Sequence, residues 1–89
     1  MRSETDVARI DKLKQELKAC NGPYPYKDAI ALLRAIGYVQ TSTGGGSRRR
    51  FVHEETKAII RLHEPHPGTE IPAYMVKQIR DLLLERKQL

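Results

Sequence analysis

Residues 44–66 have the sequence GGGSRRRFVHEETKAIIRLHEPH, and the alternation of side chains in this stretch decides the fold predicted for the chain. Apolar and polar residues alternate on both sides of a polar turn at residues 54–56, which predicts two antiparallel strands over residues 47–53 and 57–64. Successive side chains of a strand point to opposite faces of the sheet. One face of this hairpin should therefore be apolar and the other basic.

The pleat sorts the side chains of this hairpin onto its two faces. Phe51 marks the core face of the first strand, which Arg49 and His53 share. We expect Arg49 at the sheet edge and His53 as a solvated residue at the strand end. The second strand adds an unbroken apolar set to the core face: Ala58, Ile60 and Leu62. The opposite face then gathers the cationic and titratable side chains of both strands: Arg48, Arg50, Arg61 and His63.

Outside the hairpin, apolar residues spaced three and four apart predict helices. The predicted helices cover residues 4–20, 29–36 and 73–87. A further strand is predicted over residues 38–43, immediately after Gly37, a glycine suited to end the preceding helix. The connecting segments, residues 22–26 and the run after His66, contain prolines and predict linkers without regular structure.

These elements predict an α+β fold in which the two later helices cover one face of a three-stranded antiparallel sheet. The basic face stays open to solvent or a ligand. Residues 1–22 form an N-terminal amphipathic helix extension, and residues 23–89 form the main domain. The apolar stripe of the extension can pack on the domain or offer a surface for a dimer or another partner, and the sequence does not choose between these alternatives.

Length and charge narrow the class of protein. A chain of 89 residues with a net charge of +5 is long enough for one small domain and indicates an anionic partner. The longest apolar run, residues 29–33, is far shorter than the roughly 20 residues of a membrane-spanning helix. The N-terminus shows no signal segment, so we expect a cytoplasmic protein without membrane contact. The single cysteine, Cys20, excludes an internal disulfide and suits a reducing compartment.

The open face carries the groups that metal-free RNA cleavage requires: a base for the ribose 2′-hydroxyl, an acid for the leaving 5′-oxygen, and cations for the phosphate. An imidazole can act as acid or base near neutral pH, and arginine forks bind phosphate oxygens in pairs. The predicted catalytic residues are His63, His66 and Arg48. The predicted RNA-binding residues are Gly45, Gly46, Ser47, Arg48, Arg50 and Arg61.

Other ligands fit these motifs less well. The glycine run is followed by a predicted strand, whereas a nucleotide-binding P-loop continues into a lysine and a helix. His63 and His66 lack a clearly placed third ligand, so neither a metal nor another cofactor is expected. Tyr24 and Tyr26 can stack on RNA bases or pack against a helix, and both alternatives stay open.

From about residue 27 to residue 89, the sequence resembles the HicA family of bacterial type II toxins. The resemblance rests on four motifs: Ile36-Gly37-Tyr38 at a helix end, Gly46-Ser47 before a strand, proline-histidine-proline at residues 65–67, and Glu70-Ile71-Pro72 before the last helix. It implies an αβββα fold like that of double-stranded-RNA-binding domains, with residues 23–89 as the HicA-like domain. It also implies a ribonuclease that cleaves mRNA and is neutralised by a HicB antitoxin.

One position departs from the common family pattern. A histidine taken as catalytic usually follows the Gly-Ser pair, whereas this chain has Arg48 there. The chain resembles a branch that combines this arginine with a His-x-Pro-His-Pro segment, which here begins at His63. Three hypotheses stay open: a metal-independent ribonuclease toxin, a non-catalytic RNA-binding module on the same fold, and a domain that only binds a protein partner.

Overall fold

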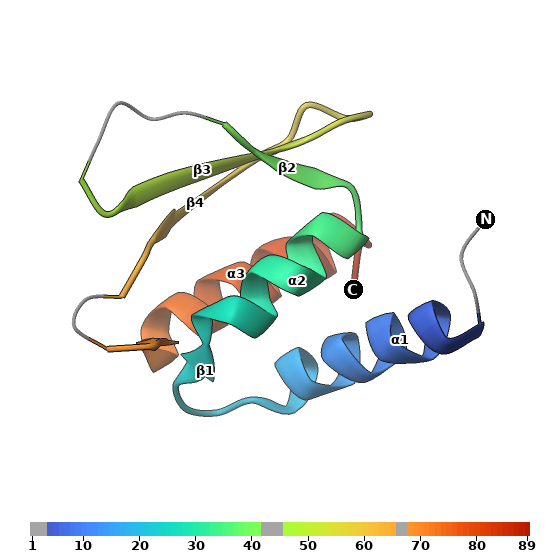
Figure 1. Cartoon of the computed structure of the whole chain (residues 1–89), viewed down its shortest axis with the longest axis horizontal. Helices are drawn as coiled ribbons and strands as arrows, with labels where there is room; N and C mark the ends of the chain where they lie inside the picture. Colours follow the sequence, from blue (N-terminus) through green and yellow to red (C-terminus); the bar gives the residue numbers. More distant parts are fainter. Residues whose placement is uncertain (1–3, 42–45, 66–67) are drawn as a thin grey trace.

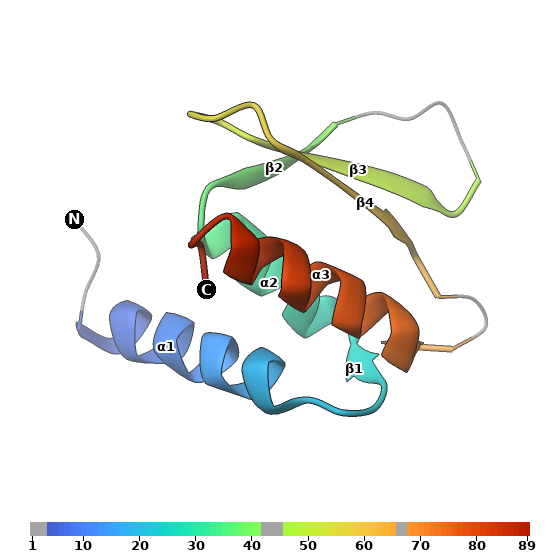
Figure 2. The ribbon, with the colours of Figure 1, turned by 180° about the vertical axis from the view of Figure 1, so that it is seen from behind.

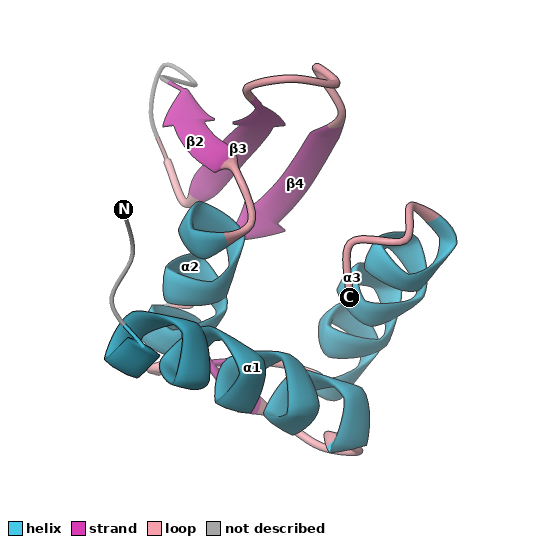
Figure 3. Cartoon of the chain, turned by 90° about the vertical axis from the view of Figure 1, so that its right-hand side faces the viewer, coloured by secondary structure: helices cyan, strands magenta, loops and turns pink. Residues whose placement is uncertain are grey.

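The computed structural model describes residues 4–41, 46–65 and 68–89. In chain order the elements are α1 (Glu4–Ala19), β1 (Tyr24–Pro25), α2 (Tyr26–Ala35), β2 (Tyr38–Thr41), β3 (Arg48–His53), β4 (Ile59–His63), β5 (Glu70–Ile71) and α3 (Ala73–Glu85). They form three layers (Figures 1 and 3). The sheet lies on one side, α2 and α3 form the middle layer, and α1 crosses both helices on the side away from the sheet.

The predicted α+β fold is confirmed. Strands β2, β3 and β4 form an antiparallel sheet in that order, with β3 in the centre. The polar turn at residues 54–56 joins β3 to β4 as predicted, and α2 and α3 lie on one face of the sheet (Figure 2). Together α2, the three strands and α3 give the αβββα arrangement of double-stranded-RNA-binding domains.

The core lies between the sheet and the two later helices, where the strand alternation placed it. The sheet contributes Phe51, Ile60 and Leu62, each at most 2% exposed. They are buried in one hydrophobic cluster with side chains of α2 and α3, among them Leu32, Leu33, Val76 and Leu83. Because alternate residues of β4 are buried, Ile59, Arg61 and His63 remain exposed on the other face.

Helix α1 packs on the domain. Leu13 and Leu17 are buried in the same cluster as the sheet residues, and each such burial contributes about 1.5–3 kcal/mol. Nη1 of Arg80 in α3 also donates a hydrogen bond of 2.7 Å to the carbonyl of Cys20, just after α1. Of the two alternatives left open by the sequence, packing of the stripe on the domain is the one observed.

Two of the predicted linkers contain regular structure, so this part of the prediction was wrong. Tyr24 pairs with Ile71, which makes β1 and β5 a small second sheet. Helix α2 begins at Tyr26, three residues before the predicted start. Pro25 has a φ of −58°, a value suited to the entry of a helix, and the Tyr26 amide donates to the Thr69 carbonyl at 2.9 Å.

Arg86, at the end of α3, ties both edge strands to that helix. Its Nη1 donates to the hydroxyl of Tyr38 in β2 at 3.0 Å, and its Nη2 donates to the carbonyl of Ile59 in β4 at 3.2 Å. The Tyr38 hydroxyl in turn donates to Oε1 of Gln88 at 2.6 Å. These bonds hold the sheet over the helices, and no described helix or strand covers its other face (Figure 2).

Candidate nucleic-acid interface

The strand register divides the open face into three rows. From the polar turn outward, the partners are Val39 with Val52 and Ile59, then Thr41 with Arg50 and Arg61, and last Arg48 with His63. One end of the face is therefore apolar and the other basic. None of these eight outward positions is acidic, so the side chains of the three rows carry positive charge only.

Three of the predicted site residues meet at the basic end of the face. Arg48 and His63 are cross-strand partners, and Oγ of Ser47 lies 3.5 Å from Nδ1 of His63. All three residues are exposed. Ser47 therefore lies on the Nδ1 side of the His63 imidazole.

Arg50 is held in place by a residue that is not among the predicted site residues. Nε of Arg50 donates to Oγ1 of Thr41 at 3.0 Å, and Oγ1 of Thr41 donates to the Arg50 carbonyl at 3.3 Å. The signal for Thr41 is its register, directly opposite Arg50 in β2. Thr41 thus orients the guanidinium of Arg50. The terminal nitrogens of this guanidinium can pair with an anion.

Arg49 faces the helices, as the alternation predicted, but its expected place at the sheet edge was wrong because β3 is the central strand. Its Nη1 donates to the carbonyl of Gly46 at 2.7 Å, and its Nη2 lies 3.4 Å from Oε2 of Glu64. Arg49 therefore fastens the start of β3 to the end of β4 instead of joining the open face.

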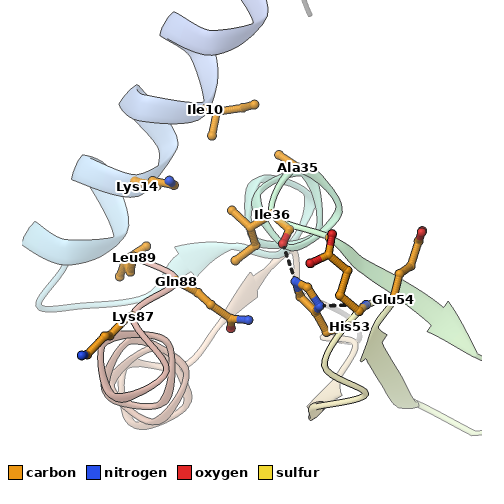
Figure 4. Close-up of a pocket in the computed structure, with 11 residues that line it drawn as sticks. Ile10, Lys14, Ala35, Ile36, His53, Glu54, Lys87, Gln88 and Leu89 are labelled. Atoms are coloured by element: carbon orange, nitrogen blue, oxygen red, sulfur yellow. Dashed lines mark hydrogen bonds between the residues drawn. The ribbon is translucent and has the colours of Figure 1, made fainter. Parts of the chain in front are cut away.

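His53 is half-buried and bonded through both ring nitrogens, so its prediction as a solvated residue was wrong. Nδ1 accepts hydrogen bonds from the amides of Glu55 and Thr56, both at 3.2 Å. Nε2 lies 3.0 Å from the Ile36 carbonyl (Figure 4), and because a carbonyl only accepts, Nε2 carries the proton. The ring also meets Tyr38 edge-on, with centroids 5.1 Å apart. His53 joins α2 to the β3–β4 turn.

A hollow of about 540 Å³ lies beside His53, between α1, the end of α2 and the C-terminal residues. Lys14 and Lys87 stand on one side of it and Glu54 on the other (Figure 4). The hollow is separate from the basic rows, because His53 points to the helix side of the sheet.

Several predicted positions lie outside the described residues. These are Gly45, His66, Pro67 and the last two residues of the strand predicted over residues 38–43. Gly46 is described, and it lies in the turn before β3 with a φ of +70°, a value that glycine adopts at no steric cost.

The described residues contain neither a membrane-spanning helix nor a cluster of metal ligands. Over residues 4–41, 46–65 and 68–89, no helix is long and apolar enough to cross a membrane. The same ranges bring together no group of three histidine, cysteine, aspartate or glutamate side chains that could hold a metal ion.

The fold and the open face of the sheet together define a class of protein. It is a small α+β domain whose sheet presents arginines and a histidine, and no acidic side chain, at the outward positions of its described strands. A family model described as the HicA toxin of bacterial toxin-antitoxin systems matches residues 26–89. The chain belongs to this family of toxins. No curated protein and no solved structure gives a significant match. The matched region begins at the first residue of α2, so α1 and β1 precede it.

Proposed function

We propose that this toxin is a metal-independent ribonuclease that cleaves mRNA and thereby inhibits translation. The observation that carries the proposal is the cross-strand pairing of Arg48 with His63 on the open face. A guanidinium binds phosphate oxygens without losing its charge, and an imidazole can take up or release a proton near neutral pH. The two groups therefore supply, side by side, what cleavage at a phosphate needs.

The proposed reaction uses the ribose 2′-hydroxyl as nucleophile. A base removes its proton, the 2′-oxygen attacks the adjacent phosphorus, and the bond from phosphorus to the 5′-oxygen breaks as an acid protonates that oxygen. The products carry a 2′,3′-cyclic phosphate and a free 5′-hydroxyl. His63 transfers one of the two protons through Nε2, since Ser47 contacts Nδ1. His66, outside the described residues, is the proposed second proton-transfer group.

The arginines of the open face bind the RNA backbone in this proposal. Arg48 stabilises the charge that gathers on the attacked phosphate, because it is the cross-strand partner of His63. Arg50 and Arg61, partners in the next row, hold a neighbouring phosphate. Gly45 and Gly46 are proposed RNA contacts because glycine has no side chain that would keep the RNA backbone away, and Ser47 is proposed to orient His63 beside the RNA.

A toxin of this family is paired with an antitoxin, and we propose a HicB-like antitoxin that covers the open face. The apolar row supports this, because Val39 is 42% and Ile59 is 37% exposed beside the arginines. An acidic partner segment over the arginines would exclude RNA directly. The proposal also places the toxin in the cytoplasm, with its mRNA substrate. A dimer through α1 remains a prediction that would have to use surface other than the buried Leu13 and Leu17.

The test is cleavage of a defined single-stranded RNA by the purified protein in excess EDTA, with analysis of the 3′ ends. The proposal expects 2′,3′-cyclic phosphate ends, and no cleavage at a position where the 2′-hydroxyl is replaced by hydrogen. Activity that disappears with EDTA, or that persists at the 2′-deoxy position, would contradict the mechanism.

A second candidate function is a non-catalytic RNA-binding module. The observation in its favour is Arg48, which stands where the common family pattern has its histidine. The same assay distinguishes the two functions, because a binding module retains the RNA and leaves it intact at every protein concentration.

A further inference from the structure

A second hollow lies on the helix side of the sheet edge, between α1, α2 and β2. It has a volume of about 450 Å³. Its walls come from three elements and from the residue that follows β4: Arg9 of α1, Tyr26, Lys27 and Arg34 of α2, Gln40 of β2, and Glu64. We call this hollow the flank groove. It is separate from the open face, because Gln40 shares its row with the buried Phe51.

The charge of the flank groove favours an anion. Three cationic side chains line it, against the two carboxylates of Asp28 and Glu64. Glu64 is already engaged by Arg49, whose Nη2 lies 3.4 Å from it. Asp28 lies in the first turn of α2, where the partial positive charge of the helix N-terminus offsets it. The three cations outnumber the two carboxylates, so the lining keeps a net positive charge.

The spacing along α2 suits an extended polymer. Lys27 and Arg34 are seven residues apart, which places them on one face of the helix about 10 Å apart. Ile30 and Ala31 lie between them and form an apolar floor. The ring of Tyr26 stands at the β1 end of this floor. Cations that follow a backbone, interleaved with apolar and aromatic surface, are the usual lining of a groove for single-stranded nucleic acid.

Tyr26 stays neutral in this setting. Burial, followed by the carboxylate of Glu64, raises the pKa of its phenol. The ring therefore adds stacking surface to the groove without adding a negative charge.

The flank groove begins where the proposed cleavage site ends. Glu64, one of its lining residues, directly follows His63, and the Glu64 amide donates to the Ser47 carbonyl at 2.8 Å. An RNA strand whose phosphate lies between Arg48 and His63 would reach the groove at Glu64, by passing around the end of β4 to the helix side of the sheet. Arg9, in a helix that precedes the matched family region, supplies the wall opposite α2.

We propose that the flank groove binds the single-stranded RNA that extends beyond the cleaved phosphate, so that α1 is part of the substrate-binding surface. This inference rests on the proposed function, because it assumes an RNA substrate on the open face. It assigns to α1 a role that packing on the domain does not by itself require.

The test compares 2′-O-methyl oligonucleotides of about four and about twelve nucleotides, lengths that bracket typical single-strand sites. These probes lack the nucleophile and stay intact. Binding is measured by fluorescence anisotropy for the wild type, the double variant Arg9→Gln/Arg34→Gln, and a matched control. The control is Lys12→Gln/Lys77→Gln, which removes two exposed cations outside this lining.

The inference expects the double variant to bind the longer probe roughly tenfold more weakly, with a shallower salt dependence, and the shorter probe within about twofold of the wild type. The control should match the wild type on both probes. Equal affinity of the double variant and the wild type for the longer probe would overturn the inference, as would an equal loss on both probes. A wild type that binds neither probe overturns the proposed function itself, which separates the two failures.

Discussion

Gly37 and His53 are in direct contact, because a Cβ built on Gly37 would lie 2.6 Å from Nε2 of His53. Gly37 also has a φ of +106°, a conformation that residues with a side chain rarely adopt. Its amide donates to the Arg34 carbonyl, and its carbonyl accepts from the Glu54 amide. This glycine thus ends α2, starts β2 and leaves room for the imidazole that fixes the next turn.

Gly37→Ala should lower the free energy of unfolding by about 3 kcal/mol, through backbone strain and the clash with His53. Urea denaturation measures the loss. In the double variant Gly37→Ala/His53→Ala the clash is relieved, so the combined loss should be smaller than the sum of the single losses. Strictly additive losses would show that the two residues are not in contact.

The two described histidines should separate stability from function. His53→Ala removes the acceptor of two amides and the donor to Ile36, which should cost about 2–3 kcal/mol of unfolding free energy. His63→Ala removes an exposed side chain, and its stability should stay within about 0.5 kcal/mol of the wild type. Thermal unfolding of both variants measures which of them loses more stability. A larger loss for His63→Ala than for His53→Ala would show that His63 is the structural histidine.

Thr41→Val should weaken RNA binding by about threefold, because it removes one hydrogen bond that orients Arg50 and keeps the branched shape of the side chain. The measurement is fluorescence anisotropy with a short 2′-O-methyl RNA probe, which is not cleaved. In an Arg50→Gln background the same substitution should have no further effect, since the group that Thr41 orients is gone. A threefold loss that persists in that background would assign Thr41 a role independent of Arg50.

Tyr24 should make the free energy of unfolding depend on pH in the alkaline range. Its hydroxyl is buried without a hydrogen-bond partner among the described residues. Burial, with Glu16 and Asp28 nearby, raises the pKa of Tyr24 to about 12. The unfolded chain loses this proton near pH 10, so the stabilising effect is complete below about pH 10 and is lost as the pH rises towards about 12.

Tyr24→Phe has no proton to lose at this position. Its unfolding free energy should equal or exceed that of the wild type by up to about 1 kcal/mol at neutral pH, because the unpaired hydroxyl is gone. Between about pH 8 and about pH 11 it should fall less steeply than the wild type. Parallel pH curves for the two proteins would mean that Tyr24 ionises equally in both states.

The sheet could be predicted from the sequence because its signal is local. Phe51, Ile60 and Leu62 alternate with polar residues, and the structure buries all three. The small sheet of β1 and β5 could not be predicted in this way. Tyr24 and Ile71 are far apart in the chain, and two-residue strands among prolines leave no periodic pattern.

The open face followed from the same alternation, which put Arg48, Arg50, Arg61 and His63 together. The alternation did not predict that His53 is structural while His63 is exposed. His53 is structural because its ring meets the Ile36 carbonyl and two turn amides, contacts that depend on how α2 packs against the turn. The flank groove could not be predicted for a similar reason: Arg9 and Arg34 belong to different helices, and only the packing of these helices brings them together.

The most direct test of the account is the single-turnover rate at which the wild type and His63→Ala cleave one defined RNA in excess EDTA. If His63 transfers a proton, the wild type should give cyclic-phosphate products, and the variant should cleave at least about a hundredfold more slowly at unchanged stability. Cleavage by His63→Ala at the wild-type rate would contradict the account, because the proton transfer assigned to β4 would then belong to another residue.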